Sequence, residues 1–155
     1  MKTWKGIVIH WSASHQKISC EEIRKWHKTK GWRDIGYHRV IEHENLYKAK
    51  RNFDSLLKEG RTLDSDIFAE PEERGAHAYG YNSDHIGICV IASPEHDISE
   101  EQIKALFYLL EVFLKRFGLK KNQVKLHKDL YATECPGVKI EQLVNNWKSS
   151  CQCCC

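Results

Sequence analysis

The stretch Lys5-Gly-Ile-Val-Ile-His-Trp11 decides the fold class, because it joins a short β-branched apolar run to a histidine near its carboxyl end. Such a run is typical of a buried strand. A second apolar run, Ile86-Gly-Ile-Cys-Val-Ile-Ala92, predicts another core strand. In α/β proteins the functional side chains gather at the carboxyl ends of the strands. His10 is therefore the first candidate for a site.

Capping patterns predict where two helices begin. A serine followed three residues later by an acid or amide occurs at Ser19-x-x-Glu22 and at Ser99-x-x-Gln102. In this pattern each side chain accepts a hydrogen bond from the other residue's backbone, which satisfies groups in the first turn of a helix. Apolar residues then recur at helical spacing until a glycine follows. The sequence predicts helices over 20–30 and 100–117.

A further strand is predicted over Gly36–Glu42, where β-branched and aromatic residues are frequent. Successive side chains of a strand point to opposite faces of the sheet. We therefore expect Tyr37, Arg39 and Ile41 on one face of this strand, with Tyr37 at its beginning.

The rest of the chain gives weaker signals. Residues 123–127 predict a last strand, and residues 140–147 a closing helix. The middle of the chain, residues 43–74, is rich in charged residues. Within it we expect a short helix over 50–58. Strands interleaved with helices indicate an α/β fold with a central sheet.

Length and composition favour a single domain. The chain has 155 residues, enough to bury a core without disulfides, and we expect a domain over 1–148 with a Cys-rich C-terminal tail over 149–155. The net charge of +3 is too small for a dedicated nucleic-acid binder. No apolar run approaches the roughly 18 residues that span a bilayer, so we expect no membrane insertion. The start lacks a secretory signal, which predicts synthesis in the cytoplasm. We expect a monomer.

Three side chains form a candidate metal site: His10, His127 at the end of its predicted strand, and Cys135 just before a Pro-Gly turn. Imidazole and thiolate are ligands that suit zinc. Three protein ligands leave a fourth tetrahedral position open, which is typical of a catalytic zinc rather than a structural one. The spacing matches no short zinc-finger signature, so a second hypothesis is a cysteine hydrolase with Cys135 as nucleophile and His127 as base.

Several segments in collinear order carry a resemblance to a known family. They are Ile7–Ala13, Glu22–His27, Gly31–His38, Gly75–Asn82, Ile86–Cys89 and His127–Gly137. Together they resemble the zinc-dependent N-acetylmuramoyl-L-alanine amidases of the phage-lysozyme type, whose superfamily includes the peptidoglycan recognition proteins. The resemblance implies a mixed central β-sheet flanked by helices, with a zinc ion in a groove on one face. It places the ligands of one Zn²⁺ per chain on the two histidines and the cysteine named above.

The resemblance also implies roles for other side chains. A catalytic tyrosine of the phage enzymes falls on Tyr37. The catalytic lysine of the phage enzymes is replaced in this chain by Thr133. Amidase-active recognition proteins also have a threonine at this position. A threonine hydroxyl can donate one hydrogen bond to an oxyanion but carries no charge. His77 and Asn82 border the groove, where we expect them to contact the muramoyl group or the stem peptide.

The implied function is zinc-dependent hydrolysis of the amide bond between N-acetylmuramic acid and L-alanine in peptidoglycan. A phage or prophage endolysin that acts on the cell wall after release or export is the setting we expect, with peptidoglycan or muropeptides as substrate. The alternatives are a catalytically inactive peptidoglycan-binding module and a cytosolic amidase that recycles muropeptides. Residues 53–66 look inserted, and we expect them at a groove wall or on the surface.

Overall fold

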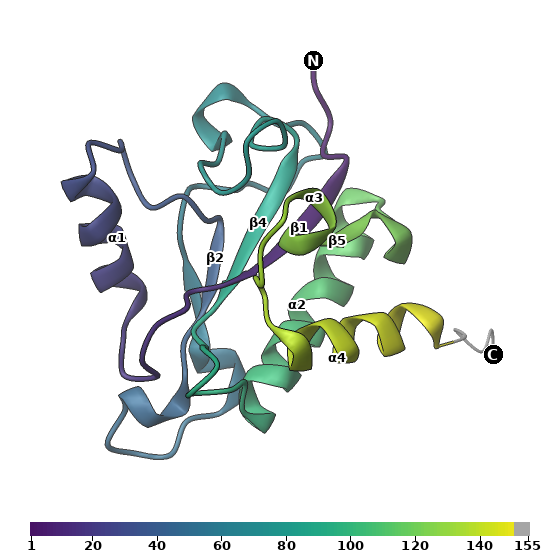
Figure 1. Cartoon of the computed structure of the whole chain (residues 1–155). Helices are drawn as coiled ribbons and strands as arrows, with labels where there is room; N and C mark the ends of the chain where they lie inside the picture. The colour runs from purple at the N-terminus through teal and green to yellow at the C-terminus, as the bar shows by residue number, and fades with distance from the viewer. Residues whose placement is uncertain (151–155) are drawn as a thin grey trace.

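A computed structural model describes residues 1–150 of the chain (Figure 1). Its strands are β1 (Gly6–Trp11), β2 (Arg39–Ile41), β3 (Leu57–Glu59), β4 (His85–Val90) and β5 (Val124–Leu126). Its helices are α1 (Cys20–Thr29), α2 (Glu100–Phe117), α3 (His127–Leu130) and α4 (Val138–Ser149), with short 3-10 turns between them. This confirms the helices expected over 20–30, 100–117 and 140–147 and the expected strands, most of them within a few residues.

The five strands form one mixed sheet in the order β3-β2-β4-β1-β5. β1 runs parallel to β4 on one side and to β5 on the other, and β2 is parallel to β4. Only β3, at the edge, is antiparallel to its neighbour. The structure therefore confirms a single-domain α/β fold with a mixed central sheet and flanking helices. Because β1 and β5 are adjacent, residues at their carboxyl ends lie side by side.

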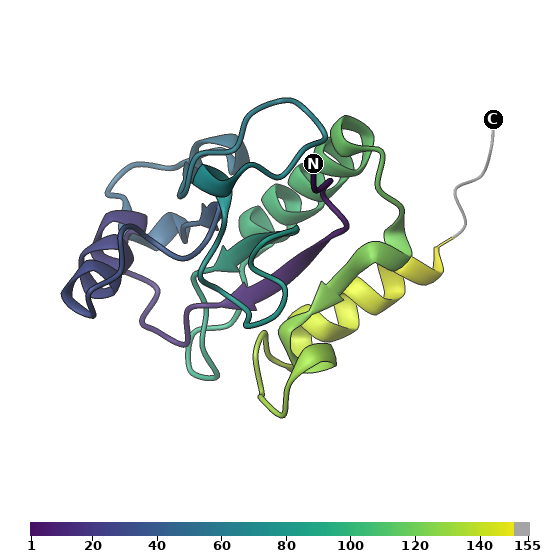
Figure 2. The ribbon, with the colours of Figure 1, turned by 90° about the horizontal axis from the view of Figure 1, so that it is seen from above.

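The two faces of the sheet are covered differently. α2 packs across one face, where Ile7 and Ile9 of β1 meet Leu106 and Leu110 in the main core cluster. α1 covers part of the other face, where Ile23 belongs to a smaller cluster formed with residues of β2 and β4. Figures 1 and 2 show α2 on one side of the sheet, with α3 and the loop after it on the other. His10 lies on the β1 part of this second face, in the region between α1 and α3 (Figure 1).

Both predicted capping boxes are present. Ser19 caps α1 and Ser99 caps α2, and in each case the side chain and the backbone exchange hydrogen bonds with the third residue of the helix. α2 ends at Gly118, which adopts the left-handed conformation with φ of 65° that favours glycine. The capping contacts that mark the start of both helices and the end of α2 join residues that are close in the sequence.

The expectation for Tyr37 needs correction. β2 begins at Arg39, and the chain bends at Gly36 and His38, so the two-residue period does not extend back to the tyrosine. Tyr37 packs with Val40 in the cluster under α1, whereas Ile41 belongs to the main core on the opposite face. The alternation that put Tyr37 and Ile41 on one face was therefore wrong.

Where a short helix was expected over 50–58, the charged middle segment forms a single 3-10 turn followed by an edge strand. A 3-10 turn at Phe53–Leu56 leads directly into β3, which pairs with β2. Leu56 is fully buried in the main core, so this segment belongs to the body of the domain. The strand order places β3 at the edge farthest from β5. Most side chains of residues 53–66 are partly or fully exposed, so this segment lies at the surface, one of the two positions expected for it, and a place in a groove wall stays a prediction.

The closing helix α4 runs to Ser149, close to the expected end of the domain. Residues 151–155, which hold the cysteines of the predicted tail, lie outside the part of the chain that the structure describes. Among the described residues, no helix has the length and apolar character that crossing a bilayer requires.

Candidate metal centre

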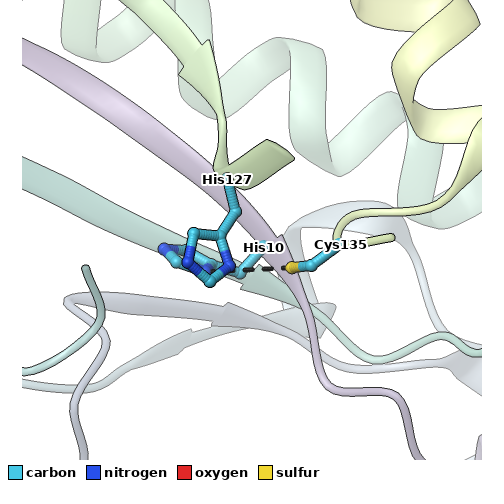
Figure 3. Close-up of side chains that lie close together, drawn as sticks. All are labelled: His10, His127 and Cys135. Atoms are coloured by element: carbon cyan, nitrogen blue, oxygen red, sulfur yellow. Dashed lines mark hydrogen bonds between the residues drawn. The ribbon is translucent and has the colours of Figure 1, made fainter. Parts of the chain in front are cut away.

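Three potential metal ligands from distant segments converge at the carboxyl ends of β1 and β5. Ile9 of β1 pairs with Leu126 of β5, so the residues that follow them, His10 and His127, are neighbours across the sheet. Cys135 comes from the loop between α3 and α4. Figure 3 shows the three side chains pointing toward one another. Their ligand atoms all lie within 4.8 Å of one another.

The loop that carries Cys135 is held by backbone contacts on both sides. The Trp11 N–H donates a hydrogen bond to Cys135 Sγ at 3.3 Å, and the Lys128 N–H donates to the Cys135 carbonyl oxygen at 2.9 Å. Gly137 lies so close to the Trp11 ring that a Cβ there would be 2.4 Å from a ring carbon. Its φ of 92° also disfavours other residues. The thiol is thus fixed beside β1.

His10 is almost completely buried and uses both ring nitrogens. Its Nδ1 lies 3.9 Å from Cys135 Sγ, and its Nε2 lies 3.0 Å from His77 Nδ1. The ring of His127 lies next to that of His10, with ring centroids 4.5 Å apart. The Nδ1 of His10 is therefore the nitrogen that faces the cysteine, and it is the atom available to a metal ion.

The donor set fits zinc. Zinc–nitrogen bonds of about 2.0 Å and zinc–sulfur bonds of about 2.3 Å bring tetrahedral ligands to about 3.3–3.6 Å from one another. The observed 3.9 Å between His10 Nδ1 and Cys135 Sγ is a few tenths of an ångström wider. Among the described residues this cluster offers three metal ligands. A four-coordinate zinc ion would therefore have one coordination position that no protein side chain fills.

The protonation states of the ligands also bear on the competing cysteine-hydrolase hypothesis. Burial raises the pKa of the Cys135 thiol to about 11, although the Trp11 N–H opposes that shift. Without a metal ion this thiol is protonated at neutral pH and is a poor nucleophile. Burial also lowers the pKa of His127, which keeps its imidazole neutral and able to bind a metal. The protonated thiol argues against a Cys135–His127 nucleophile pair, and the neutral imidazole is the form of His127 that can bind a metal ion.

Tyr37 lies beside the cluster although it is not part of β2. Its ring centroid is 5.2 Å from that of His10. Burial raises the pKa of the Tyr37 phenol well above its usual range, and the nearby Cys89 and Cys135 thiols act in the same direction. The phenol is therefore a hydrogen-bond donor at neutral pH, which is the form that acid catalysis requires.

Thr133 lies in the same loop as Cys135. Its hydroxyl oxygen accepts a hydrogen bond from the Cys135 N–H at 3.2 Å. The contact fixes the side chain next to the cysteine. Because the hydroxyl acts as acceptor in this bond, its own hydrogen remains available for another acceptor.

His77 and Asn82 belong to a loop whose polar atoms are largely used within the protein. Asn82 Oδ1 accepts hydrogen bonds from the backbone N–H groups of His77 and Ala78 at 2.7 and 2.8 Å. His77 places one ring nitrogen on His10 and the other 3.0 Å from the His85 carbonyl oxygen. Both ring nitrogens of His77 are therefore occupied, and Asn82 holds the turn. Direct contact of these two residues with substrate stays a prediction.

Sequence reasoning missed the contact between His77 and His10. The signal that could have indicated it is glycine: a Cβ at Gly75 or Gly87 would lie 2.5 or 2.6 Å from the His77 ring. It also missed Tyr131, whose ring centroid lies 5.7 Å from that of His127 and whose hydroxyl bonds the Tyr79 carbonyl oxygen.

The chain is similar in sequence to two kinds of known protein. The chain is 28% identical over 144 residues to an endolysin of Enterobacteria phage K11, covering 88% of this chain and 82% of the phage protein. It is 28% identical over 152 residues to peptidoglycan-recognition protein SC2 of Drosophila melanogaster, covering 92% and 73% of the two chains.

Among solved structures, N-acetylmuramoyl-L-alanine amidase LysC from Clostridium intestinale superposes with a TM-score of 0.72 at 24% identity, covering 96% of this chain and 88% of that one. This likeness shows a shared fold. The family model described as N-acetylmuramoyl-L-alanine amidase, Amidase_2, matches residues 1–138. The match spans every strand of the sheet and all three candidate ligands, and the chain therefore belongs to the Amidase_2 family of N-acetylmuramoyl-L-alanine amidases.

Proposed function

We propose that this protein hydrolyses the amide bond between N-acetylmuramic acid and L-alanine of peptidoglycan, with one zinc ion per chain held by His10, His127 and Cys135. The observation that carries the proposal is the convergence of two imidazoles and one thiol from three distant segments, with ligand atoms within 4.8 Å of one another. Membership of the amidase family supports the same reaction.

Zinc bound at this site would supply a Lewis acid that polarises the lactyl carbonyl and makes water nucleophilic at neutral pH. In the reaction, a water oxygen bonds to the lactyl carbonyl carbon, the bond from that carbon to the L-alanine nitrogen breaks, and the nitrogen takes up a proton. The protein's own side chains assist by donating hydrogen bonds where negative charge develops and a proton where the amine leaves.

Tyr37 and Thr133 are the side chains we assign to these tasks. The Tyr37 phenol, kept protonated by burial, helps to deliver the proton to the departing L-alanine nitrogen. The Thr133 hydroxyl, oriented by its bond from the Cys135 N–H, donates to the carbonyl oxygen as that oxygen becomes negative. Both residues lie close to the three ligands, one through its ring contact with His10 and one in the loop of Cys135.

The setting we propose is that of an endolysin made in the cytoplasm, which reaches the cell wall after release or export. Similarity to the phage endolysin along 88% of this chain supports it. A peptidoglycan-binding module without hydrolysis is the second candidate, because the chain is similar to peptidoglycan-recognition proteins as well. The thiol of Cys135 favours the enzyme, since a metal ligand is not needed for binding alone.

The test is mass spectrometry of purified sacculi digested with the protein, before and after removal of zinc by a chelator and after its restoration. The proposal predicts stem peptides with a free L-alanine amine, released only in the presence of zinc. Intact sacculi with a folded, zinc-loaded sample would favour the binding module. Cleavage that resists the chelator would instead favour Cys135 as a nucleophile.

A further inference from the structure

We propose that His77 is a positioning residue, which fixes the tautomer and the orientation of the ligand His10 and thereby sets the metal affinity of the centre. This inference rests on the proposed zinc site. It replaces a direct role in substrate binding as the main task of His77. It is drawn from a chain of contacts that begins at the His85 carbonyl oxygen, passes through His77 and ends at His10.

The hydrogen bonds along this chain have one consistent direction. A carbonyl oxygen can only accept, so the His77 Nε2, 3.0 Å from the His85 carbonyl oxygen, must carry its proton. In a neutral imidazole the other nitrogen is then an acceptor, so His77 Nδ1 accepts from the His10 Nε2–H at 3.0 Å. The His10 Nδ1 is left with a free lone pair on the side of Cys135 Sγ.

The His77 ring has little room to choose another position. A Cβ at Gly87 of the neighbouring strand would lie 2.6 Å from the ring, and one at Gly75 would lie 2.5 Å from it. The side chain thus occupies the space that two glycines leave open. The backbone of His77 is fixed as well, because its N–H and that of Ala78 both donate to Asn82 Oδ1.

A fixed acceptor behind a ligand histidine has a defined chemical effect. It selects the tautomer with the lone pair at the metal-facing nitrogen, and it makes that nitrogen more basic. Loss of such an acceptor typically weakens metal binding by about 10- to 100-fold. The same role explains why both nitrogens of His77 are used inside the protein and neither is offered to a substrate.

A matched pair of substitutions tests the role. In His77→Asn the side-chain oxygen can lie near the former Nδ1 and still accept from His10, whereas His77→Leu has a similar shape without an acceptor. Both lose the contact to the His85 carbonyl oxygen. The measurement is the zinc dissociation constant of each protein, obtained by competition with a chromophoric chelator at one pH. We expect the leucine variant to bind about 10- to 100-fold more weakly, and the asparagine variant to recover most of that loss.

A control and a second measurement complete the test. His27→Leu removes a histidine whose Nδ1 accepts from the Gly36 N–H outside this chain of contacts, and it should bind zinc like the unchanged protein. Nitrogen NMR of the unchanged, zinc-free protein reads the tautomer directly and needs no variant. The inference predicts a proton on His10 Nε2, and a proton on Nδ1 would overturn it.

The outcomes separate the two proposals. If the unchanged protein binds no zinc, the proposed function fails. If it binds zinc and His77→Leu binds equally well, only the positioning role of His77 is overturned. Equal weakening in the leucine and asparagine variants would also overturn it, because the loss would then come from packing rather than from the acceptor.

Discussion

The two faces of the central sheet are built from different chemistry. The face under α2 is lined by aliphatic and aromatic side chains, with Ile9 and Leu110 fully buried. Beside the smaller apolar cluster under α1, the opposite face also buries imidazoles: His10 is 1% exposed and His38 is 0% exposed. Each of these imidazoles has polar partners, as buried polar groups require. One face chiefly stabilises the fold, and the other holds the reactive groups in place.

The largest effect should come from removing a ligand on the polar face. Cys135→Ala takes away the only sulfur donor of the three-residue cluster found among the described residues. We expect zinc and amidase activity to be lost together, because two imidazoles alone hold the ion weakly. Metal analysis and sacculus digestion of the same sample provide the check. A variant that is free of metal and still active would refute the metal site.

Tyr37→Phe should separate chemistry from metal binding. The phenol is assigned to proton transfer and is not a ligand, so zinc content should stay at one ion per chain. The turnover number should fall by about 100- to 10,000-fold, the range for a lost general acid or base. Steady-state kinetics on a soluble muropeptide measure this effect. Loss of zinc from this variant would show that the hydroxyl acts on the metal site itself.

Leu110→Ala makes the matched change on the apolar face. Leu110 is fully buried in α2, so its truncation should lower the free energy of unfolding by about 2–5 kcal/mol. Zinc affinity and turnover of the folded protein should remain unchanged. Urea unfolding measures the free energy of unfolding, and zinc titration and kinetics on the same preparation measure zinc affinity and turnover. A large change in turnover would mean that the two faces are not independent.

Among the variants of the site, the smallest effect on turnover is expected at Thr133. Its hydroxyl is neutral, so Thr133→Val should reduce the turnover number by about 10- to 1000-fold, as for one lost oxyanion donor. Valine keeps the shape, and Thr133→Ser, which keeps the hydroxyl, serves as the control. If the valine variant works at the unchanged rate, the Thr133 hydroxyl serves only to hold the Cys135 N–H.

The apolar face was predictable from the sequence, and the polar face only in part. The strand of Ile7 and Ile9 and the capping of α2 by Ser99 depend on local patterns, so they were predicted correctly. The candidate ligands His10, His127 and Cys135 were predicted from residue type and from the family resemblance, and the structure brings them together.

The features that could not be predicted from the sequence depend on contacts between residues far apart in the chain or on bends in the backbone. β3 is three residues long and is held mainly by its pairing with β2, so no periodic pattern marks it. The side of Tyr37 was predicted wrongly because bends at Gly36 and His38 interrupt the strand period. The bond from His10 to His77 joins residues 67 positions apart, and only the folded sheet brings them into contact.

The most direct test of the polar face as a zinc centre is X-ray absorption spectroscopy at the zinc edge of the purified protein. The account predicts one sulfur at about 2.3 Å and two imidazole nitrogens at about 2.0 Å, with the fourth position not filled by a protein side chain. A metal shell without sulfur, or one closed by four protein ligands, would contradict it.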